Sequence, residues 1–498
     1  MSFIKNNIIT DKRGTLTYAQ NNELPFDIKR IFYLSNLSFI RGGHSHYKCE
    51  QILYCLNGSC DLYCTDGEKE NKYIINNKSL GFYTPNDHWI ELTNFRNNCI
   101  ILVLCSHLFD KDDYCRDKIL FYKHISKKQS HPNMNKILLN NIIKHTNPFK
   151  RELLKKVETI LSNGQFTYGD ETKEFEIKFS KYIGVNYCIS CSNGTTALIL
   201  ALQSLNLEDD SEILIQTNSY VADIIAIVNN KLNIKWIEID EQNLNIDINK
   251  IEENITNKTK AILLVHLYGI CCNMDYIIEL KNKHNLYLIE DCAQAHGSMW
   301  KNKKLGSFGD ISCFSFYPSK NLGAIGEAGC IVTNNINYYK LIESLKFFGQ
   351  KALYDYAYIG NNFKSSNIIM ASLNLKIDYL DSFNEKRREA FLLYNIYLKD
   401  NKNITFLKID KDNYINCHLC VIIVEDRDNL IKYLNNNNIE SGIHYPNPLY
   451  LTEAYNKYSS KYTNFNLLSK KIISLPIYAE IEKNEIIYIC NIINSFYT

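Results

Sequence analysis

A change in hydrophobic pattern near residue 147 constrains most strongly how this chain of 498 residues can fold. Before it, short apolar runs such as KRIFYLSNL and CIILVLCS are separated by Gly, Asn and Asp turn signals, which is typical of a β-sandwich or small barrel. After it, short strands such as ILIQT and AILLVHLYG alternate with amphipathic helical segments, which predicts a mostly parallel sheet covered by helices. The chain therefore contains two regions of different fold class.

The expected domain boundaries follow these patterns. We expect a β domain at residues 1–125, a polar linker at 126–146 that includes SKKQSHPNMNK, a large α/β domain at 147–384 and a small α+β subdomain at 385–498. The linker is expected because this stretch contains a proline and has no hydrophobic periodicity.

Composition excludes several classes of protein. Hydrophobic residues make up 45% and charged residues 22% of the chain, as in ordinary soluble globular proteins. No apolar run approaches the roughly 18 residues of a membrane span, and the N-terminus lacks the apolar core of a signal peptide. The net charge of +2 provides no basic field for binding nucleic acid. The 17 cysteines are therefore expected to be reduced thiols of a cytoplasmic protein.

Several segments of the α/β region carry residues suited to a phosphate-bearing cofactor. SNGTTALILAL puts Gly194 and Thr195 at a helix N-terminus, where free N–H groups and the helix dipole attract phosphate. IEDCAQAHG puts Asp291 at the end of an apolar strand, the place where α/β sheets present groups to a ligand. CFSFYPSKNLG puts Lys320 five residues after Ser315, in a strand-to-loop segment.

Each of these residues also has an ordinary structural explanation, such as a helix cap or a solvated surface lysine. Their order along the chain instead favours a pyridoxal phosphate site. An aspartate keeps a pyridine nitrogen protonated, so that the ring acts as an electron sink. A lysine binds the cofactor covalently and then carries protons. Tyr220 in TNSY is a candidate to stack on the ring, with an ordinary core aromatic as the alternative.

Residues from about 147 to 498 resemble the DegT/DnrJ/StrS family of sugar-nucleotide aminotransferases, which are fold-type I pyridoxal phosphate enzymes. The resemblance is carried by SNGTTAL, EDCAQAHG and FSFYPSKN, in this order. It implies that Lys320 binds pyridoxal 5'-phosphate, that Asp291 pairs with the pyridine nitrogen and that Gln294 lies near the phenolic oxygen. It also implies that other residues hold the ring or its phosphate: Tyr220, Gly194, Thr195 and Ser315.

Two further segments match this family. GNNFK places Asn362 where the family has an asparagine donated by the partner subunit, which implies a homodimer or a higher homo-oligomer. Lys364 replaces the family's arginine in that segment. IHYPNPLY resembles the family's substrate-side loop, with His444 and Tyr445 as substrate-binding residues. A subset of the family that deoxygenates sugars has histidine in place of the lysine, so Lys320 favours transamination, with glutamate as the donor by resemblance.

In the β region, RGGHSHYKCEQILYCLNGS is the segment suited to chemistry. His44 and His46 are two apart on a predicted strand, so their side chains point to the same face. If that face lines a barrel interior, two imidazoles converge on one ligand. Arg41 is placed to pair with a pyrophosphate, and Tyr33 and Trp89 are expected to form walls of the pocket.

A metal site is the competing interpretation of the two histidines. Metal-binding cupins carry H-x-H followed at set spacings by Glu and Gly, and counting back from Gly58 puts Gln51 at the glutamate position. His88 does not stand where the second cupin motif has its histidine. We therefore predict no metal ion and count Gln51 among the substrate-binding residues. A purely structural histidine pair is a further alternative.

Residues 1–125 resemble the 3,4-ketoisomerases of dTDP-4-oxo-6-deoxyglucose, which are metal-free cupins with a double-stranded β-helix (jelly-roll) fold. The matching segments are IKRIFYL, RGGHSH, EQILYCLNGS, GFYTPNDHWIEL and YCRD. The resemblance implies that His44 and His46 transfer protons. We assign His46 as the carbon base and His44 as the oxygen shuttle.

Together, the two regions predict a bifunctional enzyme of nucleotide-sugar biosynthesis. The cupin would form a 3-oxo sugar from the dTDP-linked 4-oxo sugar. The aminotransferase would then form a dTDP-3-amino-3,6-dideoxyhexose for surface glycans. One alternative is an aminotransferase acting at C-4, with a non-catalytic cupin that binds the nucleotide sugar. Another is a cupin sensor fused to an enzyme.

Overall fold

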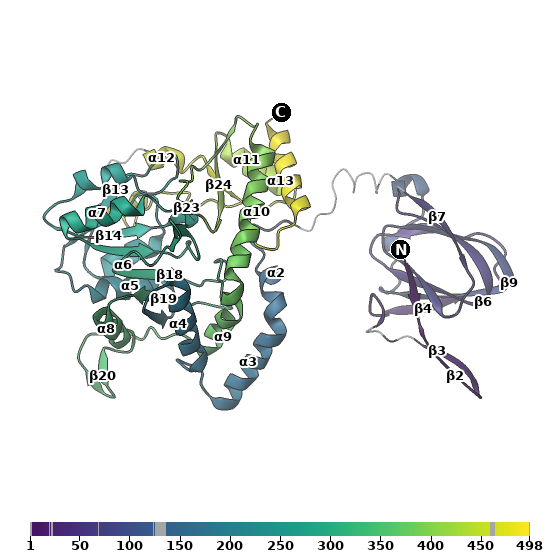
Figure 1. Cartoon of the computed structure of the whole chain (residues 1–498). Helices are drawn as coiled ribbons and strands as arrows, with labels where there is room; N and C mark the ends of the chain where they lie inside the picture. The colour runs from purple at the N-terminus through teal and green to yellow at the C-terminus, as the bar shows by residue number, and fades with distance from the viewer. Residues whose placement is uncertain are drawn as a thin grey trace. The chain divides into compact units, whose positions relative to one another are not determined.

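The computed structural model divides the chain into two compact units, Met1–Met134 and Asn135–Thr498 (Figure 1). The structure describes residues 2–18, 20, 23–67, 69–122, 124, 136–458 and 464–497. Within these ranges, no helix is both long enough and apolar enough to cross a membrane.

The first unit is built on an eight-stranded antiparallel sheet in the order β1-β8-β6-β9-β5-β10, with β4 paired to β9 and β7 paired to β6. The long strands β6 (Gln51–Thr65) and β9 (Trp89–Cys105) pair with each other along most of their length. The remaining strands are β1 (Ser2–Lys5), β4 (Arg30–Leu34), β5 (Arg41–His46), β7 (Glu70–Ile75), β8 (Leu80–Thr84) and β10 (Tyr114–Cys115), and a separate hairpin contains β2 (Asn7–Asp11) and β3 (Gly14–Tyr18).

Alternate side chains of these strands form the core of the first unit, as the period of two in a β-strand requires. Leu53, Leu62, Phe82 and Val103 belong to this core and are almost completely buried. The expected cupin-like β fold is thereby confirmed.

Gly42 introduces an irregularity into β5 directly before the two histidines. Its φ angle of +82° lies in the left-handed region, and a Cβ atom there would lie 2.6 Å from the carbonyl oxygen of Ile90. The register between β5 and β9 shifts between Gly42 and His44. A β-bulge of this kind redirects the side chains that follow it, and here it sets the position of His44.

The second unit is built on a seven-stranded sheet in the order β11-β19-β18-β15-β14-β12-β13. Its strands β12, β13, β14, β15 and β18 run parallel, whereas β19 is antiparallel to both of its neighbours. The strands are β11 (Tyr187–Cys191), β12 (Glu212–Gln216), β13 (Asn233–Ile237), β14 (Thr259–Val265), β15 (Tyr287–Asp291), β18 (Ile311–Ser315) and β19 (Gly329–Thr333).

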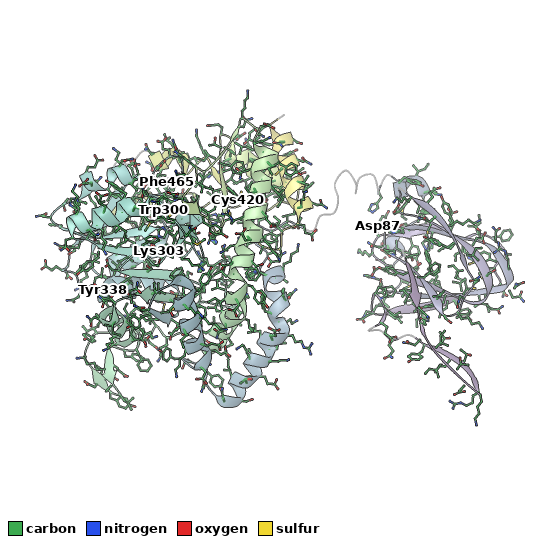
Figure 2. The ribbon with its side chains drawn as sticks, in the orientation of Figure 1. Asp87, Trp300, Lys303, Tyr338, Cys420 and Phe465 are labelled. Atoms are coloured by element: carbon green, nitrogen blue, oxygen red, sulfur yellow. The ribbon has the colours of Figure 1, made fainter. Side chains whose placement is uncertain are left out.

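Helices pack around this sheet, and their apolar residues complete the core (Figure 1). Trp300 belongs to that core and lies within the second unit (Figure 2). The helices are α2 (Ile142–Thr146), α3 (Lys150–Asn163), α4 (Asp170–Ile183), α5 (Gly194–Ser204), α6 (Val221–Asn229), α7 (Met274–His284), α8 (Ile336–Lys346) and α9 (Asn367–Lys376).

The C-terminal part of the second unit adds a small three-stranded sheet with helices packed on it. The expected division at residue 384 falls inside α10 (Leu380–Leu398), a continuous helix that belongs to both parts. The other elements are β22 (Ile404–Phe406), β24 (Cys420–Val424), β25 (Ile472–Leu475), α11 (Arg427–Asn436), α12 (Asn464–Leu468) and α13 (Lys483–Phe496). Short strand pairs elsewhere in the unit are β16 (Met299–Trp300) with β17 (Lys303–Lys304) and β23 (Asn413–Tyr414), and β20 (Gln350–Ala352) with β21 (Asp355–Tyr356).

The expected linker at 126–146 is only partly represented. Residues 126–135 lie outside the described residues. Ile137 pairs with Ile439 in a parallel bridge, and the backbone carbonyl of Leu139 accepts a hydrogen bond from the N–H of Ile477. The residues after 136 are therefore part of the second unit, which begins before the expected residue 147. Backbone pairing with segments distant in the sequence holds this polar segment, and its own sequence carries no sign of such pairing.

Candidate active sites

A cavity of about 620 Å³ lies at the carboxyl edge of the second unit's sheet. It is lined by the last residues of β14, β15 and β18, which are adjacent parallel strands. Such an edge is where α/β sheets bind their ligands. The cavity brings together nine residues that the sequence singled out: Gly194, Thr195, Tyr220, Asp291, Gln294, Ser315, Lys320, His444 and Tyr445.

The N-terminus of α5 forms one end of the cavity. Asn193 caps the helix by accepting a hydrogen bond from the N–H of Thr196, which leaves the N–H groups of Gly194 and Thr195 without an intrahelical acceptor. A Cβ atom on Gly194 would lie 2.6 Å from the Cβ of Ser315, so only glycine permits this close approach. The arrangement puts two backbone N–H groups and one hydroxyl at the same end, as an anion requires.

Lys320 lies in the loop after β18 and lines the cavity. Among the described residues, no hydrogen bond or ion pair to its amine is found. Burial lowers the pKa of Lys320 to about 8, although the nearby carboxylates of Asp291 and Asp223 partly oppose that effect. The amine therefore loses its proton at a lower pH than an ordinary lysine, which favours its action as a nucleophile.

Hydrogen bonds hold the side chains of Asp291, the last residue of β15, and Gln294, in the loop that follows. Asp291 accepts a hydrogen bond of 2.9 Å from the N–H of Ala293. Gln294 accepts one of 2.6 Å from the N–H of Tyr268, and its own amide donates one of 3.2 Å to the Tyr445 hydroxyl. Both side chains therefore have defined orientations at the cavity wall.

Three ring-bearing side chains cover other parts of the cavity. Tyr220 and Tyr445 have ring centroids 5.5 Å apart, and Tyr220 remains about half exposed. His444 contacts the Ser474 hydroxyl at 2.8 Å through Nδ1. Burial lowers the pKa of His444 to about 4, so its ring is neutral at physiological pH.

Asn362 is not part of this cavity. It pairs with Phe347 in an isolated bridge, and the adjacent Phe363 carbonyl accepts a hydrogen bond from the N–H of Ser192, just before α5. The side chain of Lys364 lies over the rings of Phe347 and the neighbouring Phe348. Within one chain, Asn362 therefore contributes nothing to the site of Lys320.

In the first unit, His46 belongs to a buried hydrogen-bonded group. Its Nδ1 lies 2.8 Å from Oδ2 of Asp113, at the end of a short 3₁₀ helix, Lys111–Asp113. The amide nitrogen of Gln51 donates to Nε2 of His46 at 3.1 Å. Both ring nitrogens of His46 are thus engaged, with the Nδ1 proton directed at the carboxylate. Motif reasoning did not identify Asp113, because it lies 67 residues from His46 in the sequence.

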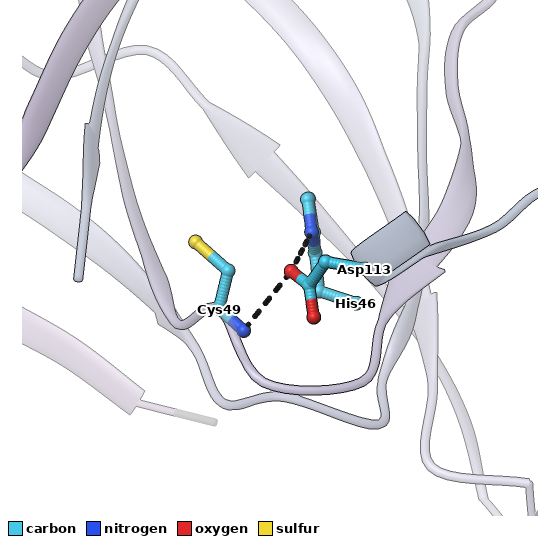
Figure 3. A group of neighbouring side chains, drawn as sticks. All are labelled: His46, Cys49 and Asp113. Carbon is cyan, nitrogen blue, oxygen red and sulfur yellow. Dashed lines mark hydrogen bonds and ion pairs between the residues drawn. The ribbon is translucent and has the colours of Figure 1, made fainter. Parts of the chain in front are cut away.

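His46, Cys49 and Asp113 carry potential ligand atoms within 4.8 Å of one another (Figure 3). The backbone N–H of Cys49 donates to Asp113, whose carboxylate also accepts from the N–H of Lys48 and from His46. The Cys49 thiol points away from the carboxylate in Figure 3. Because its carboxylate oxygens already accept these three hydrogen bonds, Asp113 is better suited to orienting His46 than to binding a cation.

His44 lies next to this group and has an unused nitrogen. The rings of His44 and His46 are 5.0 Å apart, and Tyr114 packs against both. Nδ1 of His44 is buried without a hydrogen-bond partner among the described residues. Burial lowers the pKa of His44 to about 4. Arg30 donates a hydrogen bond of 3.4 Å to the Tyr114 hydroxyl. Tyr114 and Arg30 therefore belong to the cluster around the two histidines, and the sequence motifs had identified neither of them as a site residue.

Two expected pocket residues of the first unit lie elsewhere. Tyr33 is 69% exposed and, by strand alternation, points away from the face of β4 that carries Arg30. Trp89 is buried against Cys115 and Phe121. Cys115 is paired with Ser45, so their side chains lie on the same face of the sheet. Ser45 stands between the two histidines in β5, and its side chain therefore points to the face opposite theirs. Trp89, which packs on Cys115, lies on that opposite face. The expectation that Tyr33 and Trp89 wall the histidine pocket is therefore wrong.

Arg41 starts β5 and is exposed, and within the described part of the chain it makes no hydrogen bond or ring contact to either histidine. Gln51, in contrast, contacts His46 directly and reaches Sγ of Cys105 at 3.7 Å.

Comparison with known proteins agrees with this geometry. Residues 148–494 match the DegT/DnrJ/EryC1/StrS aminotransferase family, and residues 1–126 match the family described as WxcM-like, C-terminal. The chain belongs to the DegT/DnrJ/EryC1/StrS aminotransferases. A dTDP-3-amino-3,6-dideoxy-alpha-D-galactopyranose transaminase from Aneurinibacillus thermoaerophilus is 36% identical over 349 residues, which cover 70% of this chain and 96% of that relative.

Solved structures of this aminotransferase family share the fold of the second unit. DesV from S. venezuelae, in complex with a ketimine intermediate, superimposes with a TM-score of 0.71 and 27% identity over 73% of this chain and 99% of that one. NtdA from Bacillus subtilis, with bound PMP, gives a TM-score of 0.67 and 27% identity over 73% and 86% of the two chains.

The cofactor of these DegT/DnrJ/EryC1/StrS aminotransferases is pyridoxal phosphate, and the cavity fits it. The close approach that Gly194 permits leaves two N–H groups for a phosphate, and the Lys320 amine lines the cavity with no hydrogen-bond partner among the residues that the structure describes. Asp291 supplies a carboxyl group at the cavity wall. These groups are suited to the phosphate, the aldehyde and the ring nitrogen of the cofactor, respectively.

Proposed function

We propose that the chain is a bifunctional enzyme that isomerises dTDP-4-oxo-6-deoxyglucose to its 3-oxo isomer and then aminates C-3. The observation that carries this proposal is the presence in one chain of two buried sets of proton-transfer groups. One set contains His44, His46 and Asp113, and the other surrounds Lys320. The first chemistry supplies the ketone that the second consumes.

In the aminotransferase unit, we assign each group one task. The N–H groups of Gly194 and Thr195, with the Ser315 hydroxyl, bind the phosphate. Asp291 faces the ring nitrogen, and Lys320 binds the cofactor and moves the proton between carbon atoms. When bound, the cofactor withdraws electrons from the carbon that carries the amino group. The lowered pKa of Lys320 suits this task, because a general base is most effective when its pKa is near the working pH.

In the cupin, ketone migration takes a proton from C-3, returns one to C-4 and moves the hydroxyl proton from O-3 to O-4. No proton is consumed overall. We assign His46 as the carbon base, because the Asp113 carboxylate holds its Nδ1 proton and thereby keeps the lone pair on Nε2, which faces the Gln51 amide. His44, whose ring lies 5.0 Å from that of His46, is assigned to relay the oxygen proton.

Two observations support the proposed substrate: the name of a similar protein, and the presence of both domains in one chain. The Aneurinibacillus relative is named for a dTDP-linked 3-amino-3,6-dideoxy sugar, which supports both dTDP and C-3. A C-3 amine requires a 3-oxo sugar, and a fused ketoisomerase would provide one. We assign glutamate as the amino donor.

We further propose that the aminotransferase works as a homodimer. Asn362 lies outside the cavity of its own chain, which is consistent with a role at a partner's phosphate site. The neighbouring hairpin β20–β21 is strongly exposed, with Leu353 and Tyr354 each 77% accessible. Apolar side chains exposed to this degree are suited to burial against a second copy of the chain.

The test is to incubate the full chain with pyridoxal phosphate, glutamate and dTDP-4-oxo-6-deoxyglucose, and to locate nitrogen in the product by NMR. We expect the amine at C-3. An amine at C-4 would instead support the alternative, in which the cupin only binds the nucleotide sugar. His44→Asn should stop product formation from the 4-oxo sugar. Supplying a separately prepared 3-oxo sugar should restore it, with a blank without enzyme to correct for spontaneous isomerisation.

A further inference from the structure

Asp223 is a second carboxyl group beside the cofactor site. It lies in the first turn of α6, directly after Tyr220 and Ala222, which both line the cavity. Its side chain is completely buried, whereas Asp291 retains 6% exposure and lines the cavity. No sequence motif identified Asp223, and the tasks assigned above do not use it.

The surroundings of Asp223 lack a hydrogen-bond donor in good geometry. Neither of its carboxyl oxygens has a hydrogen-bond partner within the described residues. The side chain that influences it most is Asp291, whereas the backbone of Tyr220 and the Lys320 amine act more weakly and in the opposite direction. An ionised carboxylate accepts hydrogen bonds but cannot donate one. Two ionised carboxylates in this position would therefore repel each other in a buried site.

A single proton removes this conflict. Two buried carboxyl groups in contact do not both ionise, because the like charges and the loss of hydration both oppose the second charge. Asp291 is the better site for the negative charge, since it accepts a hydrogen bond from the N–H of Ala293 and faces the cavity. Asp223 is the better site for the proton, since burial and the charge of Asp291 raise its pKa well above the ordinary value.

We propose that Asp223 is a positioning residue that carries a proton and donates it in a hydrogen bond to Asp291. One negative charge, rather than two, then faces the place of the pyridine nitrogen. The shared proton also orients the Asp291 carboxylate. The functional part of this inference rests on the role proposed for Asp291, whereas the protonation of Asp223 does not.

The charged and titratable groups near this pair are consistent with one negative charge. The Lys320 amine is the cation whose pKa responds to both aspartates. The buried hydroxyl of Tyr445 has a raised pKa, to which burial contributes most and both aspartates contribute less, so it remains a neutral phenol. The Lys320 amine is the cation among the described residues that opposes the charge of a second ionised carboxylate.

The first measurement needs no cofactor. Infrared spectra of the cofactor-free full chain, labelled with ¹³C-aspartate, should contain the C=O stretching band of a protonated buried carboxylic acid at neutral pH. Asp223→Asn should remove that band. Asp209→Asn, at an exposed surface position, should leave it unchanged. Absence of the band in the wild-type protein at neutral pH would overturn the proposal.

The second measurement uses the visible absorption of the bound cofactor. If Asp223 is neutral, Asp223→Asn keeps a neutral hydrogen-bond donor, so the pH midpoint of the absorption change should stay nearly constant. If Asp223 were ionised, loss of that charge would lower the midpoint by about one to three pH units. Should the asparagine variant not fold, Asp223→Ser keeps a neutral donor and gives the same comparison.

The same spectra separate this inference from the proposed function. A chain that shows the acid band but binds no pyridoxal phosphate would contradict the role of the cavity and leave the shared proton supported. A chain that binds the cofactor normally but shows a large midpoint shift in Asp223→Asn would contradict the shared proton alone.

Discussion

The side-chain amide of Asn140 donates a hydrogen bond of 2.8 Å to the backbone carbonyl of Ser319, the residue directly before Lys320. Asn140 belongs to the second unit and lies within residues 126–146, the range in which the sequence predicted a linker. The carbonyl of the preceding Leu139 accepts a hydrogen bond from Ile477, so this stretch is anchored on both sides. The loop that presents the cofactor lysine is therefore held in part by a segment that precedes residue 147.

We predict that Asn140→Ala weakens pyridoxal phosphate binding by about five-fold, because a hydrogen bond to a backbone carbonyl contributes about 1 kcal/mol. Titration of the cofactor-free chain by visible absorption measures this. Asn141→Ala is the matched control, since Asn141 caps α2 and does not contact the lysine loop. An equal loss of affinity in that control would mean that the effect reflects general destabilisation.

The second prediction concerns the protonation of Lys320 in the cofactor-free chain. Its pKa of about 8 means that its reactivity toward an acylating reagent should be half-maximal near pH 8. Peptide mass spectrometry after brief acylation measures this, with exposed Lys231 as the reference for reagent reactivity. Lys320→Ala should abolish both the visible absorption of covalently bound cofactor and amine formation. Wild-type transamination by that variant would contradict the assignment.

The third prediction concerns the stability of the first unit against acid. The folded state lowers the pKa of His44 from 6.5 to about 4, so the unfolded chain binds more protons between these values. Stability should therefore fall as the pH decreases from about 6.5 to 4. Hydrogen exchange of peptides from the first unit, measured at pH 7 and pH 5, tests this. His44→Asn should show a smaller decrease than the wild-type protein, and an equal decrease would contradict the prediction.

The fourth prediction concerns Asp113. Asp113→Asn replaces the acceptor of the His46 Nδ1 proton by an amide that can also donate, so the ring loses its defined tautomer. We expect isomerisation to slow by about two to four orders of magnitude. Amination of a supplied 3-oxo sugar should be unaffected. Asp112→Asn, at the exposed neighbouring position, is the control and should isomerise normally.

The fifth prediction concerns assembly. Asn362→Ala should accelerate loss of pyridoxal phosphate during dialysis while leaving isomerisation intact, because the side chain is assigned to a partner's site. Light scattering should give the mass of a dimer or a larger assembly. A monomer that retains full aminotransferase activity would refute a shared site.

Sequence motifs located the cavity residues well. Gly194, Asp291 and Ser315 lie at strand ends or helix starts, and Lys320 lies in the loop after β18; the order of such elements determines which edge of a parallel sheet they share. Local sequence was sufficient to predict these positions, because the alternation of strands and helices along the chain itself implies that the strands run parallel.

Strand faces in the first unit were predicted less well. Tyr33 and Trp89 were expected beside the histidines, but they lie on other faces. A shift of one residue in register moves a side chain to the opposite face of a sheet, and the irregularity at Gly42 occurs in this region. Hydrophobic pattern alone does not determine such a register.

The sequence by itself determined the two fold classes, the family of the aminotransferase and the residues that line its cavity, because each depends on local periodicity or on a short motif. The tertiary structure alone decided that Asp113 orients His46, that Asn140 holds the lysine loop and that Asp223 meets Asp291. The members of each pair lie tens to hundreds of residues apart in the sequence. Hydrogen bonding and proton sharing depend on distance in space, which only the packing of the folded chain establishes.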